Sequence, residues 1–193
     1  MKNKMILPEN TIILVALESE LPRNVLPDWT IIYTGVGKVN ASIAASKAIL
    51  SYQPDMMLNY GTAGSLVPSI HGLIEVGQFI ERDMNVEALG FAKGLTPFEE
   101  DIAISFGYGE IRCGTGDQFV TSTPDIMTEV VDMEAYALAK CARFHGCDFR
   151  ALKYISDMAD DTAANDWQSN QTKGAQLFVE WLNMARHGGD TRT

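Results

Sequence analysis

Short apolar runs alternate with segments of helical spacing along this chain, and most of the runs stop at glycine or at a charged residue. Residues 11–17 form an unbroken apolar run rich in Ile and Val, which predicts a strand buried on both faces. Six later runs of similar length predict further strands: residues 30–34, 55–59, 76–80, 110–114, 129–133 and 149–156. The pattern therefore predicts a sheet of short, buried strands.

Helical patterns lie between and after these strands. Residues 40–50 and 134–145 have the small and apolar spacing of packed helices, and residues 166–186 suit a closing amphipathic helix. Because strands alternate with helices, and crossovers are right-handed, the fold class expected is α/β, a three-layer α/β/α sandwich around a mixed, mostly parallel sheet. We expect one domain over residues 1–186 and a polar tail at residues 187–193.

One long segment interrupts this order. Residues 83–100 have no steady hydrophobic period, because Gly90, Gly94 and Pro97 break up the apolar positions. The segment is predicted to be a long loop. Loops of this length inside a compact domain often have a function.

The composition limits the class of partner. The chain has 193 residues, 46% of them hydrophobic, which is enough for a substantial core. A formal net charge of -10, with the Lys and Arg residues scattered, argues against a nucleic-acid partner. The apolar runs are too short for a membrane span or a signal-peptide core. We therefore expect no membrane partner and a cytoplasmic location.

The cysteines and histidines do not predict a metal or redox site. Cys113, Cys141 and Cys147 cannot all pair within one chain, and none of them has metal-ligand spacing. Reduced thiols fit a cytoplasmic protein. The three histidines are isolated from one another and are interpreted as structural. We expect no metal and no cofactor.

Carboxylates lie where predicted strands stop, and this is the clearest sign of a reaction. Glu134 follows the run that ends at Met133, and Asp157 follows Ser156 at the end of the last strand. In open α/β sheets ligands bind beyond the carboxyl ends of strands, where burial raises the pKa of a carboxyl. Asp157 is equally compatible with a general acid and with a helix N-cap, and Glu134 also suits the first turn of a helix.

Other polar features are weaker. Glu18 and Glu20 follow the first strand, where solvated carboxylates are the common outcome. Gly35 and Gly37 favour a tight turn over a phosphate loop, because no third glycine follows at the required position. The small residues at 61–64 would let a ligand approach the main chain, and a purely structural role is equally compatible.

Six blocks in one order carry a resemblance: residues 16–20, 34–39, 59–66, 116–119, 131–135 and 155–160. Together they resemble the purine nucleoside phosphorylase and nucleosidase superfamily, and most of all its methylthioadenosine/S-adenosylhomocysteine nucleosidase branch. The resemblance spans residues 11–186. It implies a nucleoside phosphorylase-like fold, cleavage of a purine N-glycosidic bond without metal or cofactor, a homodimer, and a role in methionine salvage.

The resemblance also implies roles for single residues. Glu20 would activate the attacking water, Asp157 would protonate the purine at N7, and Glu134 with the main chain of Met133 would hold the ribose hydroxyls. The other residues that it places at the substrate are Thr62, Ala63 and Gly64 on the water and ribose side, Phe119 and Val120 at the base, Ser156 beside Asp157, and Leu89 on the 5′ side. Bond cleavage builds positive charge on the sugar and negative charge on the base, so carboxylates and a proton donor suit the reaction.

The sequence departs from the branch in several places. The first acidic block reads Glu-Ser-Glu where three acidic residues are common, and Gly-Thr-Ala-Gly-Ser replaces a motif with Ser and a second Gly. The segment after Glu20 is short, which predicts a missing hairpin and a trimmed or more open pocket. The chain is also short between Val120 and Glu129, which predicts that the usual helix before the ribose-binding strand is reduced. The loop at residues 82–91 resembles the family's 5′ loop, often shared across a dimer interface, and its Asn85 and Glu87 are compatible with a polar 5′ group.

We therefore expect a hydrolase that acts with water on methylthioadenosine, S-adenosylhomocysteine or a related 5′-modified adenine nucleoside. A phosphorylase on the same fold is the nearest alternative. Such enzymes place an arginine near the glycine loop, and no arginine lies between Arg23 and Arg82. The alternative from another class is an inactive nucleoside-binding protein.

Overall fold

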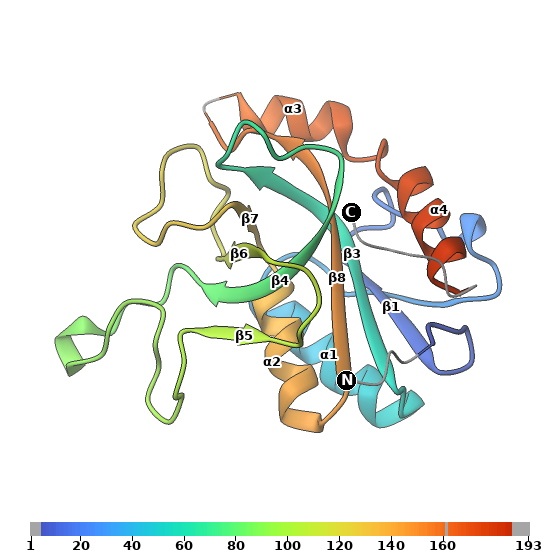
Figure 1. Ribbon diagram of the computed structural model, residues 1–193, viewed down its shortest axis with the longest axis horizontal. Helices are drawn as coiled ribbons and strands as arrows, with labels where there is room; N and C mark the ends of the chain where they lie inside the picture. Colours follow the sequence, from blue (N-terminus) through green and yellow to red (C-terminus); the bar gives the residue numbers. More distant parts are fainter. Residues whose placement is uncertain (1–4, 161, 187–193) are drawn as a thin grey trace.

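One mixed sheet runs through the centre of the molecule in the computed structural model, which describes residues 5–160 and 162–186 (Figure 1). Within those residues its eight strands are β1 (Thr11–Val15), β2 (Thr30–Tyr33), β3 (Met56–Ser65), β4 (Leu73–Glu81), β5 (Ala103–Ser105), β6 (Ile111–Thr115), β7 (Val130–Asp132) and β8 (Asp148–Asp157). The main path is β2-β1-β3-β7-β6-β4-β5, and β8 pairs with both β3 and β4.

Most neighbouring strands are parallel. β1 pairs in parallel with β2 and β3, β3 with β8, β4 with β6, and β6 with β7. The pairs β3–β7, β4–β5 and β4–β8 are antiparallel. Because β8 joins β3 to β4, the pairs among β3, β8, β4, β6 and β7 close a ring, and the ends of β3, β7 and β8 are brought close together.

Strand β1 shows why the sheet is buried on both faces. Ile12 and Leu14 pack into one apolar cluster, whereas Ile13 and Val15 pack into a second cluster on the other face. Successive side chains of a strand point to opposite faces, so an unbroken apolar run serves both layers. This confirms the predicted strand buried on both faces, although it ends at Val15 and not at residue 17.

Helices cover both faces of the sheet. Helices α1 (Lys38–Tyr52) and α2 (Ala135–His145) contribute to the first cluster, and α4 (Ala175–Arg186) contributes Phe178, Trp181 and Leu182 to the second. Figure 1 shows α1 and α2 side by side, away from α4, with α3 (Ala163–Asn170) over the ends of the long central strands. The predicted three-layer α/β/α sandwich with a mixed, mostly parallel sheet is therefore confirmed.

Two predicted elements differ from the structure. The strand predicted over residues 55–59 is longer in the structure, because β3 continues to Ser65 beside its parallel partner β8. The single helix predicted over residues 166–186 is two helices, α3 and α4. They are separated near Gly174, where a Cβ atom would lie 2.4 Å from the side chain of Tyr154, so only glycine fits this close approach.

Smaller differences concern the edge of the sheet. The three-residue strand β5 was not predicted, since it is short and is held by pairing with β4 at the edge. The loop at residues 83–100 is confirmed, with one short 3-10 turn, η2 (Glu87–Leu89).

None of the helices in the described ranges is long and apolar enough to cross a membrane. The predicted tail at residues 187–193 lies outside the described residues, and the single domain over residues 1–186 stays a prediction.

Candidate active site

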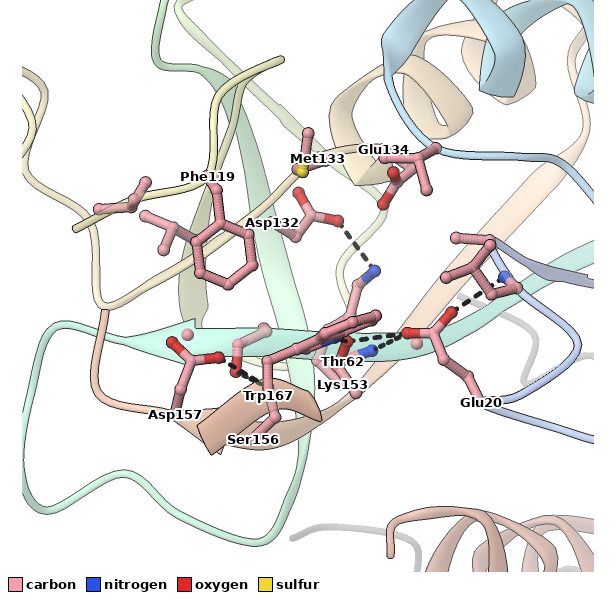
Figure 2. A pocket seen from close by; sticks show the side chains of 18 of the residues that line it. Glu20, Thr62, Phe119, Asp132, Met133, Glu134, Lys153, Ser156, Asp157 and Trp167 are labelled. Carbon is pink, nitrogen blue, oxygen red and sulfur yellow. Dashed lines mark hydrogen bonds and ion pairs between the residues drawn. The ribbon is translucent and has the colours of Figure 1, made fainter. Parts of the chain in front are cut away.

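A cavity of about 180 Å³ lies where β1, β3, β7 and β8 end. Ten of the eleven residues expected at the site line it: Glu20, Thr62, Ala63, Gly64, Phe119, Val120, Met133, Glu134, Ser156 and Asp157. Figure 2 shows Glu20 and Asp157 on opposite sides of this cavity, with Thr62 and Trp167 between them. The closed ring of strand pairs therefore gathers residues from distant parts of the chain.

Glu20 is buried in the turn that follows β1 and is held by three donors. Its Oε1 accepts from the main-chain N–H of Thr62 at 2.9 Å and from the Thr62 hydroxyl at 2.8 Å. Its Oε2 accepts from the N–H of Leu17 at 3.1 Å. Hydrogen bonds of this kind fix the carboxylate in one orientation, as an acceptor of a proton requires.

Asp157 ends β8 at the opposite side of the cavity. The pairing of β3 with β8 shifts by one residue there, so that Ile155 lies opposite Ala63 and Asp157 opposite Gly64. The Oδ1 atom of Asp157 accepts from the N–H of Ala159 at 2.9 Å, and Oδ2 accepts from the Ser156 hydroxyl at 2.8 Å.

Burial raises the pKa of Asp157 above its ordinary value, although the two hydrogen bonds oppose the rise. The side chain also depends on Gly64. A Cβ atom at position 64 would lie 2.6 Å from Asp157 Oδ1, so a larger residue would displace the carboxyl group. A carboxyl with a raised pKa, buried in a cavity wall, can donate a proton to a ligand.

Glu134 precedes α2 and is buried near the middle of the cavity. Its Oε1 accepts from the N–H of Gly37 at 2.8 Å, so the glycine turn after β2 holds it in place. Burial and the neighbouring charge of Asp132 raise its pKa to about 7. Lys153 acts in the opposite direction. Glu134 therefore titrates near neutrality.

A buried ion pair below Glu134 was missed by sequence reasoning. Lys153 on β8 lies 2.8 Å from Asp132 on β7, and both side chains are at most 2% exposed. Asp132 also accepts from the Thr115 hydroxyl at 2.5 Å and from the N–H of Ala135 at 2.8 Å. Both residues line the cavity. The only signal in the sequence was a lone lysine inside an apolar strand, four residues before Asp157.

Phe119 lies on a loop at the cavity wall, and the residue is 43% exposed. The loop is held by Arg82, whose guanidinium donates to the carbonyl oxygens of Gly116 and Gln118. A flat aromatic ring on a braced loop suits stacking against a purine base.

A second set of bonds joins this loop to the glycine turn. The N–H of Lys38 donates to Asp117 Oδ1 at 2.7 Å, and the N–H of Asp117 donates to Asp83 Oδ2 at 2.8 Å. The Lys38 ammonium contacts Asp83 at 2.6 Å and Glu81 at 2.8 Å. The turn at residues 35–38 therefore braces both Glu134 and the loop that carries Phe119.

Two further residues complete the comparison with the expected site. Trp167 on α3 lines the cavity and was interpreted from sequence only as an apolar helix residue. Leu89 does not line this cavity, because it lies on η2 with 70% of its surface exposed. Among the described residues no group of three or more His, Cys, Asp or Glu side chains is arranged to hold a metal ion.

Comparisons with known proteins agree with this geometry. A family model described as the phosphorylase superfamily matches residues 27–97 and 109–182, so the chain belongs to the phosphorylase superfamily. This confirms the superfamily expected from the six sequence blocks.

Within the superfamily, the chain is similar to proteins named 5′-methylthioadenosine/S-adenosylhomocysteine nucleosidase. The protein of that name from Hydrogenovibrio crunogenus is 27% identical, with 80% of each chain covered. The one from Buchnera aphidicola is 26% identical, over 72% of this chain and 71% of the relative.

Solved structures share the fold. A mutant of the Helicobacter pylori nucleosidase, with 5′-methylthioadenosine in its active site, superposes with a TM-score of 0.84 at 21% identity, over 93% of this chain and 98% of that one. The futalosine hydrolase of the same organism superposes with a TM-score of 0.82 at 22% identity, over 92% and 97%.

Proposed function

We propose that this protein hydrolyses the N-glycosidic bond of a purine nucleoside, with adenine as the base and a modified 5′ position, and releases free base and sugar. The observation that carries the proposal is the placement of Glu20 and Asp157 on opposite sides of one cavity. Glu20 is a fixed acceptor, and Asp157 is a buried carboxyl whose pKa is raised above its ordinary value by burial. The names of the relatives support the same reaction.

The leaving base takes a proton from Asp157. As the bond between C1′ and the purine breaks, its electron pair moves into the base, and N7 accepts the Asp157 proton. Phe119 stacks on the base, and the main chain of Val120 lies at its edge. Ser156 keeps the Asp157 carboxyl oriented through the bond to Oδ2.

The sugar is held on the other side of the cavity. Glu134 and the main chain of Met133 bind the ribose hydroxyls, while residues 62–64 line the water and ribose side. Positive charge develops on the ribosyl ring, and the carboxylates of Glu20 and Glu134 stabilise it. Glu20 takes one proton from the attacking water, whose oxygen bonds to C1′.

The cavity is better suited to water than to phosphate as the nucleophile. Two cationic side chains line it, Lys153 and Arg82. Lys153 is paired with Asp132 at 2.8 Å, and Arg82 donates to two main-chain carbonyl groups on the base side. A bound phosphate would therefore compete with Asp132 for Lys153, and with the two main-chain carbonyl groups for Arg82.

A homodimer in the cytoplasm completes the proposal. The loop around η2 exposes Leu89, and the face of α1 and α2 exposes Val39, Ile43 and Phe144. Exposed apolar side chains of this kind suit contact with a second copy. Leu89 would then reach the 5′ side of the partner's nucleoside. Sedimentation at micromolar concentration should give twice the monomer mass.

The test is release of free base from methylthioadenosine, S-adenosylhomocysteine, adenosine, inosine and futalosine, each with and without phosphate. Adenine release that does not depend on phosphate is expected. Strict dependence on phosphate would make the protein a phosphorylase, and binding by calorimetry without any release would make it an inactive nucleoside-binding protein. The Glu20→Gln variant should bind nucleoside but not hydrolyse it.

A further inference from the structure

The Trp167 side chain extends from α3 to the cavity, where its indole group makes a hydrogen bond. Its indole N–H donates to the Thr62 hydroxyl at 2.8 Å, and the indole is half-buried in the cavity wall. Figure 2 shows the indole between Asp157 and Glu20, over Thr62. The sequence predicted no role for this side chain. The residue that it contacts, Thr62, in turn binds Glu20.

The Thr62 hydroxyl has one proton and two acceptor lone pairs. It donates that proton to Glu20 Oε1 at 2.8 Å while it accepts from Trp167. The indole therefore fixes the direction of the hydroxyl, because a rotated hydroxyl would lose one of the two bonds. Without the indole the hydroxyl could turn away from Glu20.

The two oxygens of Glu20 consequently differ. Oε1 accepts two bonds, both from Thr62, whereas Oε2 accepts one bond, from the N–H of Leu17. A carboxylate oxygen has two lone-pair sites, so Oε1 is filled and Oε2 retains one site. The chain from Trp167 through Thr62 to Glu20 thus leaves Oε2 as the oxygen with a free acceptor site.

The helix that carries the indole is itself anchored beside the site. The Asn170 side chain donates to the carbonyl oxygen of Ser156 at 2.8 Å, and Ser19 donates to Gln171 at 2.7 Å. One anchor lies next to Asp157 and the other lies next to Glu20. The position of the indole therefore depends on both walls of the cavity.

We propose that Trp167 is a positioning residue for hydrolysis, acting through Thr62 to keep Glu20 Oε1 occupied and to leave Oε2 for the proton of the attacking water. This rests on the proposed function. In the step, the water oxygen bonds to C1′ and one water proton moves to Oε2. The electrons of the glycosidic bond leave with the purine, which takes the Asp157 proton. Exchange with solvent then returns Glu20 and Asp157 to their starting states.

The experiment is a double-mutant cycle with Trp167→Phe and Thr62→Val, measured as adenine release from methylthioadenosine. Trp167→Phe keeps an aromatic ring but loses the N–H group, so kcat should fall about threefold to tenfold, the usual effect of one neutral hydrogen bond. KM should change by less than about twofold, because the ring remains. In the Thr62→Val background, Trp167→Phe should have no further effect on kcat.

Two control variants separate an effect on the position of Glu20 from an effect on the stability of the protein. Thr62→Ser keeps a hydroxyl group and should restore the sensitivity of kcat to Trp167→Phe. Trp29→Phe makes the same replacement at a buried tryptophan that does not line the cavity, and it should leave kcat unchanged. Thermal unfolding of each variant confirms that the compared proteins are folded.

The outcomes are distinct. Additive effects of the two substitutions, or a change in KM alone, would refute the positioning role while the hydrolase stands. If the parent protein releases no base from any nucleoside, the proposed function is refuted and the role of Trp167 falls with it.

Discussion

Strand β8 buries two positive charges, Arg150 near its start and Lys153 in its middle, and a comparison of the two separates stability from chemistry. At the start of the strand, Arg150 pairs with Glu75 through contacts of 2.6 and 3.0 Å. Its guanidinium lies 4.7 Å from the ring centre of Tyr108 and 4.8 Å from that of Trp181. This charge is enclosed by partners and lies away from the cavity.

Lys153, three residues further along, pairs with Asp132 at 2.8 Å and lines the cavity. Its charge lowers the pKa of Glu134, while burial and Asp132 raise it. The pair at Lys153 therefore differs from the pair at Arg150 because a third titratable group, Glu134, shares its surroundings. The pair at Arg150 serves packing, and the pair at Lys153 sets the charge of the cavity.

The largest expected effect is on activity at the cavity end of β8. Asp157→Asn removes the proton that the leaving base requires, so kcat should fall by about two to four orders of magnitude. Adenine release in single-turnover and steady-state assays measures the loss. A variant with near-parental kcat would remove Asp157 from the mechanism.

Stability should respond differently to the same substitution. The pKa of Asp157 is raised in the folded protein, so the carboxyl contributes stability below its unfolded pKa, and this is lost as pH rises through the folded pKa. Asn does not ionise. The variant should therefore be at least as stable as the parent at neutral pH, as measured by urea unfolding, and a large loss of stability would make Asp157 a structural residue.

At the other end of β8 the expected effect is on stability alone. Arg150→Met leaves the Glu75 carboxylate buried without its cation, which should cost roughly 3–5 kcal/mol of unfolding free energy. Urea unfolding measures the change, and kcat of the folded variant should stay near the parental value. The double variant with Glu75→Gln should recover much of the loss. A fall in kcat without loss of stability would erase the contrast between the two ends.

The smallest expected effect is a shift in pH dependence. Ribose binding needs ionised Glu134, whose pKa is about 7, so kcat/KM should rise with pH through this region. Asp132→Asn removes a charge that raises this pKa, so the acid limb should move to lower pH. Cys113→Ala is a matched control, since the Cys113 thiol also contacts Asp132 but stays neutral because burial raises its pKa. An unmoved limb in Asp132→Asn would assign the titration to another group.

Sequence reasoning recovered most strands because their runs are mainly apolar, and it recovered the layers because helices alternate with strands. It could not find the ring of pairs through β8, since pairing partners are decided by contacts between distant segments. The same limit hid β5, whose three residues depend on β4 for their conformation. The break between α3 and α4 lies near Gly174, whose close approach to the Tyr154 side chain is a contact between separate elements.

In the candidate site, too, residues with a local sequence pattern were found and residues defined by contacts with distant segments were missed. Glu134 and Asp157 stood out because a carboxylate after an apolar run is a local pattern. Lys153 and Trp167 did not, because each looks like an ordinary member of its strand or helix. Their importance comes from partners on other elements, Asp132 on β7 and Thr62 on β3.

The glycine turn after β2 has a consequence for how new substrate preferences can arise. Gly37 donates its N–H to Glu134, and the next N–H, of Lys38, holds Asp117 beside the loop of Phe119. Gly37 has a φ of +93°, and a Cβ atom there would lie 3.1 Å from Asp117 Oδ1. A side chain at this position would disturb the sugar and base subsites together. Substitutions on the loop of Leu89 leave this turn intact, so in the proposed enzyme they would change the 5′ side without disturbing the sugar and base subsites.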